Sequence, residues 1–407
     1  MGAEARERMG LGWYARGLAL SAAAFAWRRL HRSTTFVAVT GTAGKSTAVR
    51  FLAAMLGSTA PAVAMDGVAN HRHAVARAVL RTRRRHRFTV LEVASKVPGT
   101  LRRAAASIRP DVAVVLNVRP MHTNRFATLD AMAAEKAMIV RGVPASGVIV
   151  LNRDDPRVMA MSALTAARVV TFGSDRRADV WWSDASSVWP DRLAFTVHYG
   201  RDSQRVATRL VGEHWAVVVT AALGAAVACG IELAAAVAAA ADLEPAPARL
   251  EPVPLPSGAV LLRDECNASV TTYGPALAIL AAARGVRRVA VVGDTWDSGL
   301  GEPGRHEALG RAVAASADLA VFVGAGSEHA ARAAMAAGME PGRVTIPETL
   351  PVAARLLGEL TGDGDLVLLK GQVIQHLSRL YLAQIRPIAC WRTTCQRMRR
   401  CDLCPSL

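Results

Sequence analysis

The sequence is poor in cysteine, in aromatic side chains and in acidic residues. Six cysteines in 407 residues, with Cys229 and Cys266 far from the rest, fit a reducing compartment such as the cytoplasm better than a disulfide-stapled scaffold. The 49 Lys and Arg residues outnumber the 33 Asp and Glu residues, and the net charge of +16 favours anionic partners. We find no nucleic-acid-binding motif. The one dense basic run, Arg81–Arg87, is interpreted as a solvated loop before a strand, with a contact to an anionic partner as the alternative.

Long apolar runs are also missing. The uncharged stretch Gly17–Trp27 is shorter than the about 20 residues that a membrane-spanning helix needs. A cleaved signal peptide is not expected, because a predicted strand begins soon after this stretch. Aromatic residues and arginines flank it, which predicts an amphipathic helical segment over residues 1–33. Two interpretations stay open: the segment packs on the protein, or residues 11–30 make a peripheral membrane contact.

Short β-branched runs separated by alanine-rich stretches predict an α/β fold. Buried parallel strands are expected in four segments, residues 36–40, 88–93, 112–118 and 147–152. Helices are expected after Ser46 and over residues 130–140, and short alternating strands are expected at the side of this sheet between residues 180 and 211.

The proline-rich segment 244–254 predicts a domain boundary. After it, four more apolar runs each end in a loop and alternate with helices. We therefore expect a P-loop doubly wound central ATPase domain over residues 34–246 and a smaller Rossmann-like C-terminal domain over 247–386, followed by a cysteine-rich basic tail over 387–407.

A glycine-rich loop follows the first predicted strand. The sequence VAVTGTAGKST runs from this strand through the loop into a predicted helix, and backbone N–H groups in such a loop bind phosphate oxygens. Lys45 would neutralise the terminal phosphates, and Ser46 would reach a Mg²⁺ ion. The usual loop, G-x-x-x-x-G-K-[ST], has another glycine where this chain has Val39. The predicted nucleotide-binding residues of this segment are Thr42, Gly44, Lys45, Ser46 and Thr47.

Three further polar residues lie near predicted strand ends. Glu92 ends a strand in VLEVASK, His122 follows a strand in VAVVLNVRPMH, and Lys136 lies on the helix in DAMAAEKAMIV. Open α/β sheets bind ligands at the carboxyl ends of their strands, so we expect all three beside the loop. This combination is more than a plain P-loop ATPase or kinase needs, which disfavours those two classes.

These motifs strongly resemble those of the Mur ligases, ATP-dependent amide-forming enzymes of bacterial cell-wall synthesis. That family has its own loop form, T-G-T-x-G-K-[ST], so Val39 is not a defect. The resemblance runs from about Val37 to Leu377 and is closest to the member that adds D-alanyl-D-alanine. The segments LEVASKVPGTL and RPDVAVVLNVRPMHTNRF follow the central domain of that member.

The resemblance implies roles for these residues. Glu92 would help to hold the Mg²⁺ that bridges the ATP phosphates, and His122 would hold a second Mg²⁺. Lys136 would carry a carbamate formed with CO₂, which turns a cation into an oxygen ligand for a hard metal. The expected catalytic residues are Lys45, Glu92, His122, Lys136 and Arg249, and the expected Mg²⁺ ligands are Ser46, Glu92, His122 and Lys136.

Later motifs match the family with departures. Arg249 in PARLE matches the arginine that reaches towards the phosphates, and Asp264 and Asn267 in RDECNAS match nucleotide-contacting positions, with Asp264 as a candidate ribose contact. His214 matches a G-x-H-N segment, but Trp215 stands where asparagine is typical. Further matches are Gly293, Asp294, His306, Lys370 and Gly371.

The implied reaction joins a carboxylate to an amine through an acyl phosphate, on a cell-wall or related peptide or amino-acid substrate. Relatives that act on UDP-linked muropeptides carry a uridine-nucleotide-binding domain before the loop, and we expect that domain to be absent here. The acceptor would then be held by a protein partner, by the membrane or as a smaller molecule. Alternatives are a poly-γ-glutamate-type or secondary-metabolite amide ligase, and an ATP-binding subunit that acts only with a partner.

The tail contains four of the six cysteines in the pattern C-x₄-C-x₅-C-x₂-C, and the last pair has a spacing that lets two thiolates face one metal. A structural Zn²⁺ is one interpretation. A loosely ordered basic tail, an iron–sulfur cluster and disulfides are the others. The predicted zinc ligands are Cys390, Cys395, Cys401 and Cys404.

Overall fold

The computed structural model describes residues 3–65, 72–95, 97–120, 125–126, 128–296, 301–392, 395 and 400–407. It divides into two compact units, each with its own sheet. The N-terminal unit comprises Met1–Ala185, Ala194–Thr208 and His214–Leu243. The C-terminal unit comprises Ser186–Leu193, Arg209–Glu213 and Glu244–Leu407.

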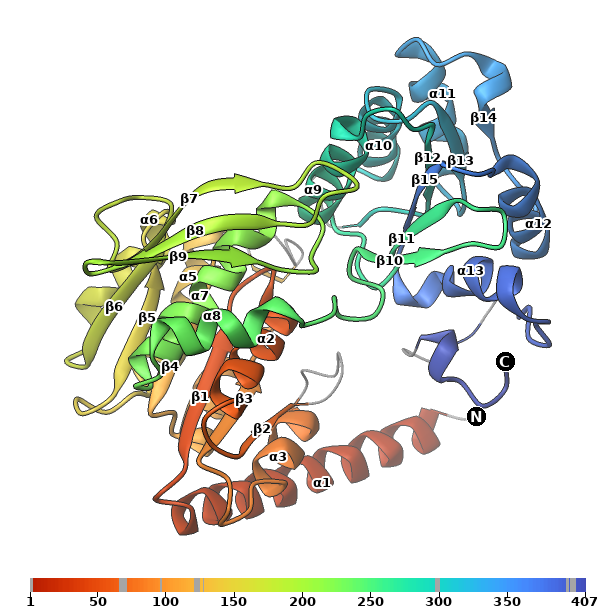
Figure 1. The fold of residues 1–407 in the computed structure, drawn as a ribbon. Coiled ribbons are helices and arrows are strands. Elements are labelled where there is room, and N and C mark those ends of the chain that lie inside the picture. The colour runs from red at the N-terminus through yellow and green to blue at the C-terminus, as the bar shows by residue number, and fades with distance from the viewer. Residues whose placement is uncertain are drawn as a thin grey trace. The chain divides into compact units, whose positions relative to one another are not determined.

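The described residues of the N-terminal unit form a nine-stranded sheet in the order β2-β3-β1-β4-β5-β6-β7-β8-β9 (Figure 1). Its strands are β1 (Thr35–Thr40), β2 (Ala62–Ala64), β3 (Phe88–Glu92), β4 (Val112–Val115), β5 (Val148–Asn152), β6 (Arg168–Gly173), β7 (Val180–Ser186), β8 (Ala194–Tyr199) and β9 (Asp202–Ala207). Pairing is parallel from β2 to β7, and β8 and β9 form an antiparallel hairpin. The four predicted buried strands and the alternating strands at the side of the sheet are confirmed. The four buried strands are continuous β-branched runs, because the strands of a parallel sheet are buried on both faces.

Helices cover both faces of this sheet. They are α1 (Ala3–Leu30), α2 (Lys45–Gly57), α3 (Arg72–Leu80), α4 (Thr100–Ile108), α5 (Leu129–Val140), α6 (Pro156–Met159), α7 (Ala216–Ala228) and α8 (Leu233–Ala241), with 3₁₀ turns η1 (Ala160–Leu164) and η2 (Glu213–Trp215). The crossover from β1 to β2 runs the opposite way along the sheet from those that follow. Right-handed crossovers therefore place α2 on one face and α3, α4 and α5 on the other. α7 and α8 pack with α2, and α1 packs on α3 and α4.

One face of α1 packs on the unit. Gly17, Ala24 and Arg28 are buried at helical spacing, and the Arg28 guanidinium donates to Ile108 O (2.9 Å) and pairs with Asp111 (2.8 Å). Among the residues that the structure describes, no helix is long and apolar enough to cross a membrane. Among residues 16–30 of α1, the large apolar side chains that stay exposed are Leu18, Phe25, Trp27 and Leu30.

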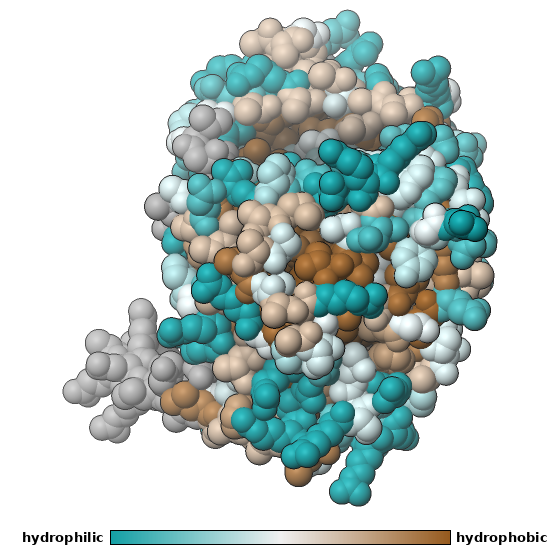
Figure 2. Space-filling view, turned by 90° about the vertical axis from the view of Figure 1, so that its left-hand side faces the viewer, coloured by the Kyte–Doolittle hydropathy of each residue, from teal (hydrophilic) through white to brown (hydrophobic). Residues whose placement is uncertain are grey.

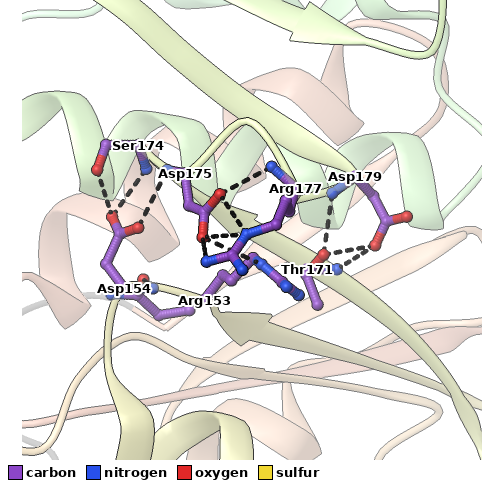
Figure 3. Close-up of polar contacts among 8 residues, drawn as sticks. Arg153, Asp154, Thr171, Ser174, Asp175, Arg177 and Asp179 are labelled. Atoms are coloured by element: carbon purple, nitrogen blue, oxygen red, sulfur yellow. Dashed lines mark hydrogen bonds and ion pairs between the residues drawn. The ribbon is translucent and has the colours of Figure 1, made fainter.

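Carboxylates fix the turn between β6 and β7, as Figure 3 shows. Asp154 accepts hydrogen bonds from the backbone N–H groups of Ser174 (2.8 Å) and Asp175 (3.2 Å). Asp175 in turn pairs with Arg177 (2.7 Å) and Arg153 (3.4 Å), and the hydrogen bonds from Arg177 lower the pKa of Asp175. This network joins β5, β6 and β7 where the parallel sheet meets the hairpin, so its role is structural.

The described residues of the C-terminal unit form a six-stranded sheet in the order β10-β11-β15-β12-β13-β14 (Figure 1). Its elements are β10 (Glu251–Pro254), β11 (Val260–Asp264), α9 (Val270–Ala282), β12 (Arg288–Val292), α10 (Glu302–Ala314), β13 (Leu319–Phe322), α11 (Ser327–Ala336), η3 (Pro341–Arg343), β14 (Val344–Thr345), α12 (Leu350–Leu360), β15 (Leu366–Lys370), η4 (Val373–Gln375), α13 (Ser378–Ile385) and η5 (Cys401–Leu403). β10 pairs antiparallel with β11, and the other pairs are parallel. The α/β class with two doubly wound sheets is thus confirmed.

Candidate active site

The glycine-rich loop joins β1 to α2 and has a conformation that only glycine adopts easily. Gly44 has φ +84°, and a Cβ there would lie 2.7 Å from Val218 Cγ2. The N–H groups of Thr42 and Ala43 both donate to Asn117 Oδ1 at 3.0 Å. Asn117 lies just after β4, so the neighbouring strand end orients the loop. α2 begins at Lys45, and its N-terminus adds positive potential for an anion.

Lys45, Ser46 and Glu92 meet at this loop. Lys45 Nζ donates to Gly41 O and Thr42 O, both at 2.9 Å, which holds the amine over the loop. Ser46 Oγ donates to Glu92 Oε2 at 2.7 Å. Glu92 ends β3, the neighbour of β1, and is buried. A hydroxyl and a carboxylate side by side at a phosphate loop form the kind of oxygen set that Mg²⁺ prefers.

Lys136 on α5 has lost most of its contact with water, with 4% of its surface exposed. The pKa of Lys136 is lowered to about 7, chiefly by burial and also by the positive charge of Lys45, while Glu135 acts in the opposite direction. α5 lies beside the loop, since Thr42 Oγ1 is 3.6 Å from the sulfur of Met132 on the same helix. The lowered pKa favours the neutral amine, which is the form that reacts with CO₂.

Glu135, next to Lys136, ties α5 to the loop that follows Glu92. Its buried carboxylate accepts hydrogen bonds from Ser95 Oγ (3.0 Å), Gly99 N (2.6 Å) and Leu101 N (2.8 Å). Two of these donors belong to the first turn of α4 and its cap, where backbone N–H groups lack helical partners. Glu135 thus fixes the start of α4 and the segment after β3.

The structure places the other predicted residues of this unit with one exception. Thr42 is buried and its Oγ1 donates to Arg119 O (3.3 Å), and Thr47 is buried within α2. His122, the predicted second Mg²⁺ ligand, lies outside the described residues. The described predicted residues that come together are Thr42, Gly44, Lys45, Ser46, Thr47, Glu92 and Lys136.

In the C-terminal unit, Asp264 and Lys370 are register partners on β11 and β15. Lys370 Nζ donates to the Asp264 carboxylate and to Asn267 O (3.0 Å), and lies 5.1 Å from the centre of the Tyr273 ring. Burial raises the pKa of Asp264, while Lys370 and Arg249 oppose this shift. One oxygen of the predicted ribose contact is therefore already held in a buried ion pair.

Arg249 lies in a strained segment of the same unit. Its neighbours Ala248 (φ +57°) and Leu250 (φ +51°) are both in the left-handed region, which costs about 1–2 kcal/mol for each residue with a Cβ. The N–H of Ala248 donates to Glu251 Oε2 (2.9 Å). Backbone strain of this kind persists only where the surrounding structure fixes the conformation. The fixed backbone here also sets the orientation of Arg249.

Asp294 and His306, matched in the sequence, form one network. Asp294 follows β12 and accepts hydrogen bonds from the N–H groups of Ala325 (3.1 Å) and Gly326 (2.9 Å), just before α11. His306 is buried, donates through Nδ1 to Glu302 O (2.8 Å), and has its Nε2 3.5 Å from Asp294 Oδ1. The network fixes the loop ends of β12 and β13 relative to each other.

Four cysteines and a histidine surround one cavity in the tail region. They are Cys390, Cys395, Cys401, Cys404 and His376. Cys401 Sγ accepts a hydrogen bond from Arg379 Nε and lies next to His376 Nδ1, both at 3.4 Å. All four cysteines are free thiols. Within the described part of the chain no three His, Cys, Asp or Glu side chains are arranged to hold a metal ion, so the predicted zinc site finds no support.

Asn117 and Glu135 both shape the phosphate site, although neither was predicted from the sequence. Neither type of residue is diagnostic in a single sequence, because their roles come from contacts across the fold.

The composition of the chain does single out its lysines. The chain has 49 Lys and Arg residues, of which only four are lysines, at positions 45, 96, 136 and 370. Where arginine supplies the general positive charge, a lysine marks a position that needs a compact or titratable amine.

Two family models match the chain. Residues 39–226 match the Mur ligase middle domain, and residues 248–373 match the Mur ligase glutamate ligase domain. The crystal structure of MurF from Acinetobacter baumannii superposes with a TM-score of 0.82 and 25% identity, covering 90% of this chain and 80% of that one. MurF from Thermotoga maritima, solved in complex with ADP, gives a TM-score of 0.77 at 21% identity, covering 90% of this chain and 82% of that one, and so shows the same fold.

Curated relatives agree with these matches. The UDP-N-acetylmuramoyl-tripeptide–D-alanyl-D-alanine ligase of Mycobacterium tuberculosis is 32% identical over 318 residues, which is 76% of this chain and 62% of the relative. The enzyme of the same name from Mycobacterium leprae is 30% identical over 368 residues, covering 83% of this chain and 70% of the relative. The chain therefore spans somewhat less than two thirds of the length of the first of these. On its two matched domains, its sheet topology and its phosphate loop, the chain belongs to the Mur ligase family.

Proposed function

We propose that the protein is an ATP-dependent ligase that joins a carboxylate to an amine in peptidoglycan synthesis. The observation that carries this proposal is the buried Lys136, with its lowered pKa, beside the phosphate loop and the Ser46–Glu92 pair. Hydrolysis of ATP alone does not require such an amine. The relatives named above act on a UDP-linked muropeptide and D-alanyl-D-alanine, so these are the first substrates to test.

The reaction balances in two steps. A carboxylate oxygen of the first substrate attacks the γ-phosphorus of ATP, the bond to ADP breaks, and an acyl phosphate forms. The amine then attacks the acyl carbon, inorganic phosphate leaves from the tetrahedral intermediate, and the amine loses a proton to solvent. Positioning and neutralisation of phosphate charge are the protein's main contributions to such a transfer.

The described residues fit a Mg²⁺ ion, because Ser46 Oγ and Glu92 Oε2 place two oxygen donors together at the loop. When bound there, the ion would supply charge neutralisation at the phosphates. Lys45 would turn from the carbonyls of Gly41 and Thr42 to the terminal phosphates, keeping its donors satisfied. His122 is the proposed ligand of a second Mg²⁺.

Lys136 is the proposed site of carbamylation. Its neutral amine would attack CO₂ at carbon and lose a proton, giving a carbamate with two oxygens and a negative charge. This change removes the repulsion between Lys136 and Lys45, because the buried cation becomes an anion. The carbamate would offer oxygen donors of the kind that Mg²⁺ prefers.

In the C-terminal unit, Arg249, Asp264 and Asn267 are proposed nucleotide contacts. The strained backbone on both sides of Arg249 supports this proposal, because such strain persists where the position of the side chain is required. The Asp264 carboxylate already accepts a hydrogen bond from Lys370, so a ribose contact would share the carboxylate with that amine. Zinc has no part in the proposed reaction.

We also propose that the protein works in the cytoplasm at the inner face of the membrane, with residues 11–30 in peripheral contact. Free thiols at all six cysteines agree with a reducing compartment. Exposed apolar side chains on α1, with arginines beside them, support the membrane contact.

The test is phosphate release by the full-length chain with ATP, Mg²⁺, the UDP-linked tripeptide and D-alanyl-D-alanine. Release should require both organic substrates and should yield a dipeptide-extended product by mass spectrometry. The Lys45→Ala variant is the matched control for contaminating ATPases. Release that is independent of the amine would instead indicate a plain ATPase.

A further inference from the structure

The part of the chain before β4 has an extreme charge imbalance. Between Arg16 and Pro110 the sequence has 17 Lys and Arg residues but only two acidic residues, Asp66 and Glu92. Glu92 belongs to the phosphate site, so it does not balance the charge elsewhere. An imbalance confined to one segment points to a charged surface rather than to a property of the whole protein.

The fold gathers many of these arginines at one edge of the N-terminal unit. We call this set the arginine surface; its members are all exposed and are Arg29, Arg32, Arg81, Arg83, Arg84, Arg85, Arg87 and Arg109. Three segments contribute: the end of α1, the run before β3, and the end of α4. Figure 2 views the molecule from the side on which α1 ends, and hydrophilic residues gather over its lower part.

Direct contacts hold the three segments together. Trp27 Nε1 donates to Thr82 O (2.8 Å), and Thr34 Oγ1 donates to His86 O (2.7 Å), which joins the end of α1 to the basic run. Arg28 Nη2 donates to Arg109 O (3.0 Å), which joins α1 to the end of α4. The exposed arginines are therefore carried by a fixed backbone and not by a loose run.

The arginine surface is separate from the phosphate site. It surrounds the residues where β1, β3 and β4 begin, whereas the glycine-rich loop and Glu92 lie where β1 and β3 end. A strand of six residues such as β1 is about 20 Å long. The arginines therefore cannot contact a nucleotide bound at the loop, and their charge is available to another partner.

Apolar side chains project among these arginines. Leu30 is 72% exposed, and Phe25 and Trp27 are more than one third exposed. The guanidinium of Arg29 lies 3.4 Å from the centre of the Phe25 ring, so a cation and an aromatic face occur as a pair. The nearby acidic residue, Asp111, is neutralised by Arg28.

We propose that the arginine surface, with Phe25, Trp27 and Leu30, docks the protein on a membrane rich in anionic lipid. Arginines would pair with lipid phosphates while the apolar side chains enter the interface. A nucleic acid would pair with the arginines but would offer no apolar environment for the exposed Leu30, so we favour the bilayer. The proposal deepens the membrane contact proposed for residues 11–30, and it rests on that location but not on the ligase reaction.

The experiment is flotation of the full-length protein with vesicles of phosphatidylcholine containing 30% phosphatidylserine, compared with pure phosphatidylcholine, at low and high salt. The test variant is Arg83→Gln/Arg84→Gln/Arg85→Gln. Its matched control is Arg176→Gln/Arg201→Gln/Arg205→Gln, which removes three exposed arginines from the β6–β9 side of the same unit. A third variant, Leu30→Gln, tests the apolar contact.

Wild-type protein should bind the anionic vesicles and not the neutral ones, and salt should weaken binding. Each arginine near an anionic surface contributes about fivefold, so the test variant should bind roughly 100-fold more weakly. Leu30→Gln should bind several-fold more weakly, and the control should bind as wild type does. The proposal would be overturned if the test and control variants lost binding equally, or if the triple-arginine variant and Leu30→Gln both bound as wild type does. It would also be overturned if stoichiometric RNA prevented vesicle binding while Leu30→Gln had no effect. ATP-dependent phosphate release by each variant without vesicles reports separately on the ligase proposal.

Discussion

The substitution Glu135→Gln removes a buried charge that three donors share. In the native unit, Oε1 accepts from Ser95 Oγ and Leu101 N, and Oε2 accepts from Gly99 N. A glutamine has one oxygen and one NH₂ group, so at least one of these donors would face another donor. The remaining bonds would lose their charge assistance.

The magnitude follows from these contacts. An unsatisfied buried donor costs about 1–3 kcal/mol, and a hydrogen bond to a charged group is worth roughly 1 kcal/mol more than a neutral one. We therefore expect the segment from Val97 to Ala104 to lose about 2–4 kcal/mol of local stability. Every 1.4 kcal/mol is tenfold, so amide hydrogen exchange there should accelerate roughly 30- to 1,000-fold.

Hydrogen-exchange mass spectrometry of peptides covering residues 97–104 is the assay. Asp130→Asn is the matched control, because Asp130 lies on the same helix in an exposed ion pair with Arg157. Such pairs contribute at most about 1 kcal/mol, so exchange in this peptide should stay close to that of wild type. Exchange in Glu135→Gln within twofold of wild type would refute the role given to this carboxylate.

Four other substitutions test the phosphate site and the buried ion pair of the C-terminal unit. Lys45→Ala should abolish ATP turnover and leave the circular dichroism spectrum unchanged, because the amine serves phosphates; native turnover would contradict the loop assignment. Lys136→Ala should be inactive and partly rescued by short carboxylic acids that replace the carbamate oxygens, and high-resolution density for a bare amine with Mg-ATP bound would contradict the carbamate. Because the pKa of Lys136 is about 7 in the folded protein and 10.5 otherwise, the unfolded chain holds the proton more tightly. In carbonate-free buffer Lys136→Met should therefore stabilise the protein most below pH 7, and the gain in melting temperature should vanish as pH rises towards 10.5; a pH-independent gain would count against this burial. Lys370→Met should lower the free energy of unfolding by about 3–5 kcal/mol, because Asp264 stays buried without its cation. The double variant Lys370→Met/Asp264→Leu should recover most of this loss. A stable single variant together with an unstable double variant would show that Lys370 does not stabilise the buried Asp264 carboxylate.

The sequence was most informative where local pattern and burial coincide. The strands β1, β3, β4 and β5 are continuous β-branched runs, and a parallel sheet with both faces covered requires such runs. Gly44 was identified from the phosphate-loop motif, and the structure adds the reason for a glycine, because the residue before α2 has a left-handed conformation.

The roles of residues that act through contacts distant in the sequence could not be predicted from the sequence. Asn117 orients the phosphate loop across 74 or 75 residues of sequence, and Glu135 reaches the start of α4 across 34 to 40 residues. Asp264 matched a nucleotide-contacting position, but its pairing with Lys370 spans 106 residues and had no local signal. The packing of α1 was one of the two interpretations that the sequence left open, and no stripe of large apolar residues favoured it: among residues 16–30 the buried positions of the helix are Gly17, Ala24 and Arg28.

The central claim, transfer of phosphate from ATP to a carboxylate, is tested most directly by isotope transfer. The first substrate is prepared with ¹⁸O in its reacting carboxylate and incubated with the protein, Mg-ATP and the amine. The account predicts one ¹⁸O atom in each inorganic phosphate released, since the acyl phosphate keeps the bond between phosphorus and the carboxylate oxygen. Phosphate without ¹⁸O, released at the rate of ATP consumption, would mean that water attacks ATP and would contradict the ligase mechanism.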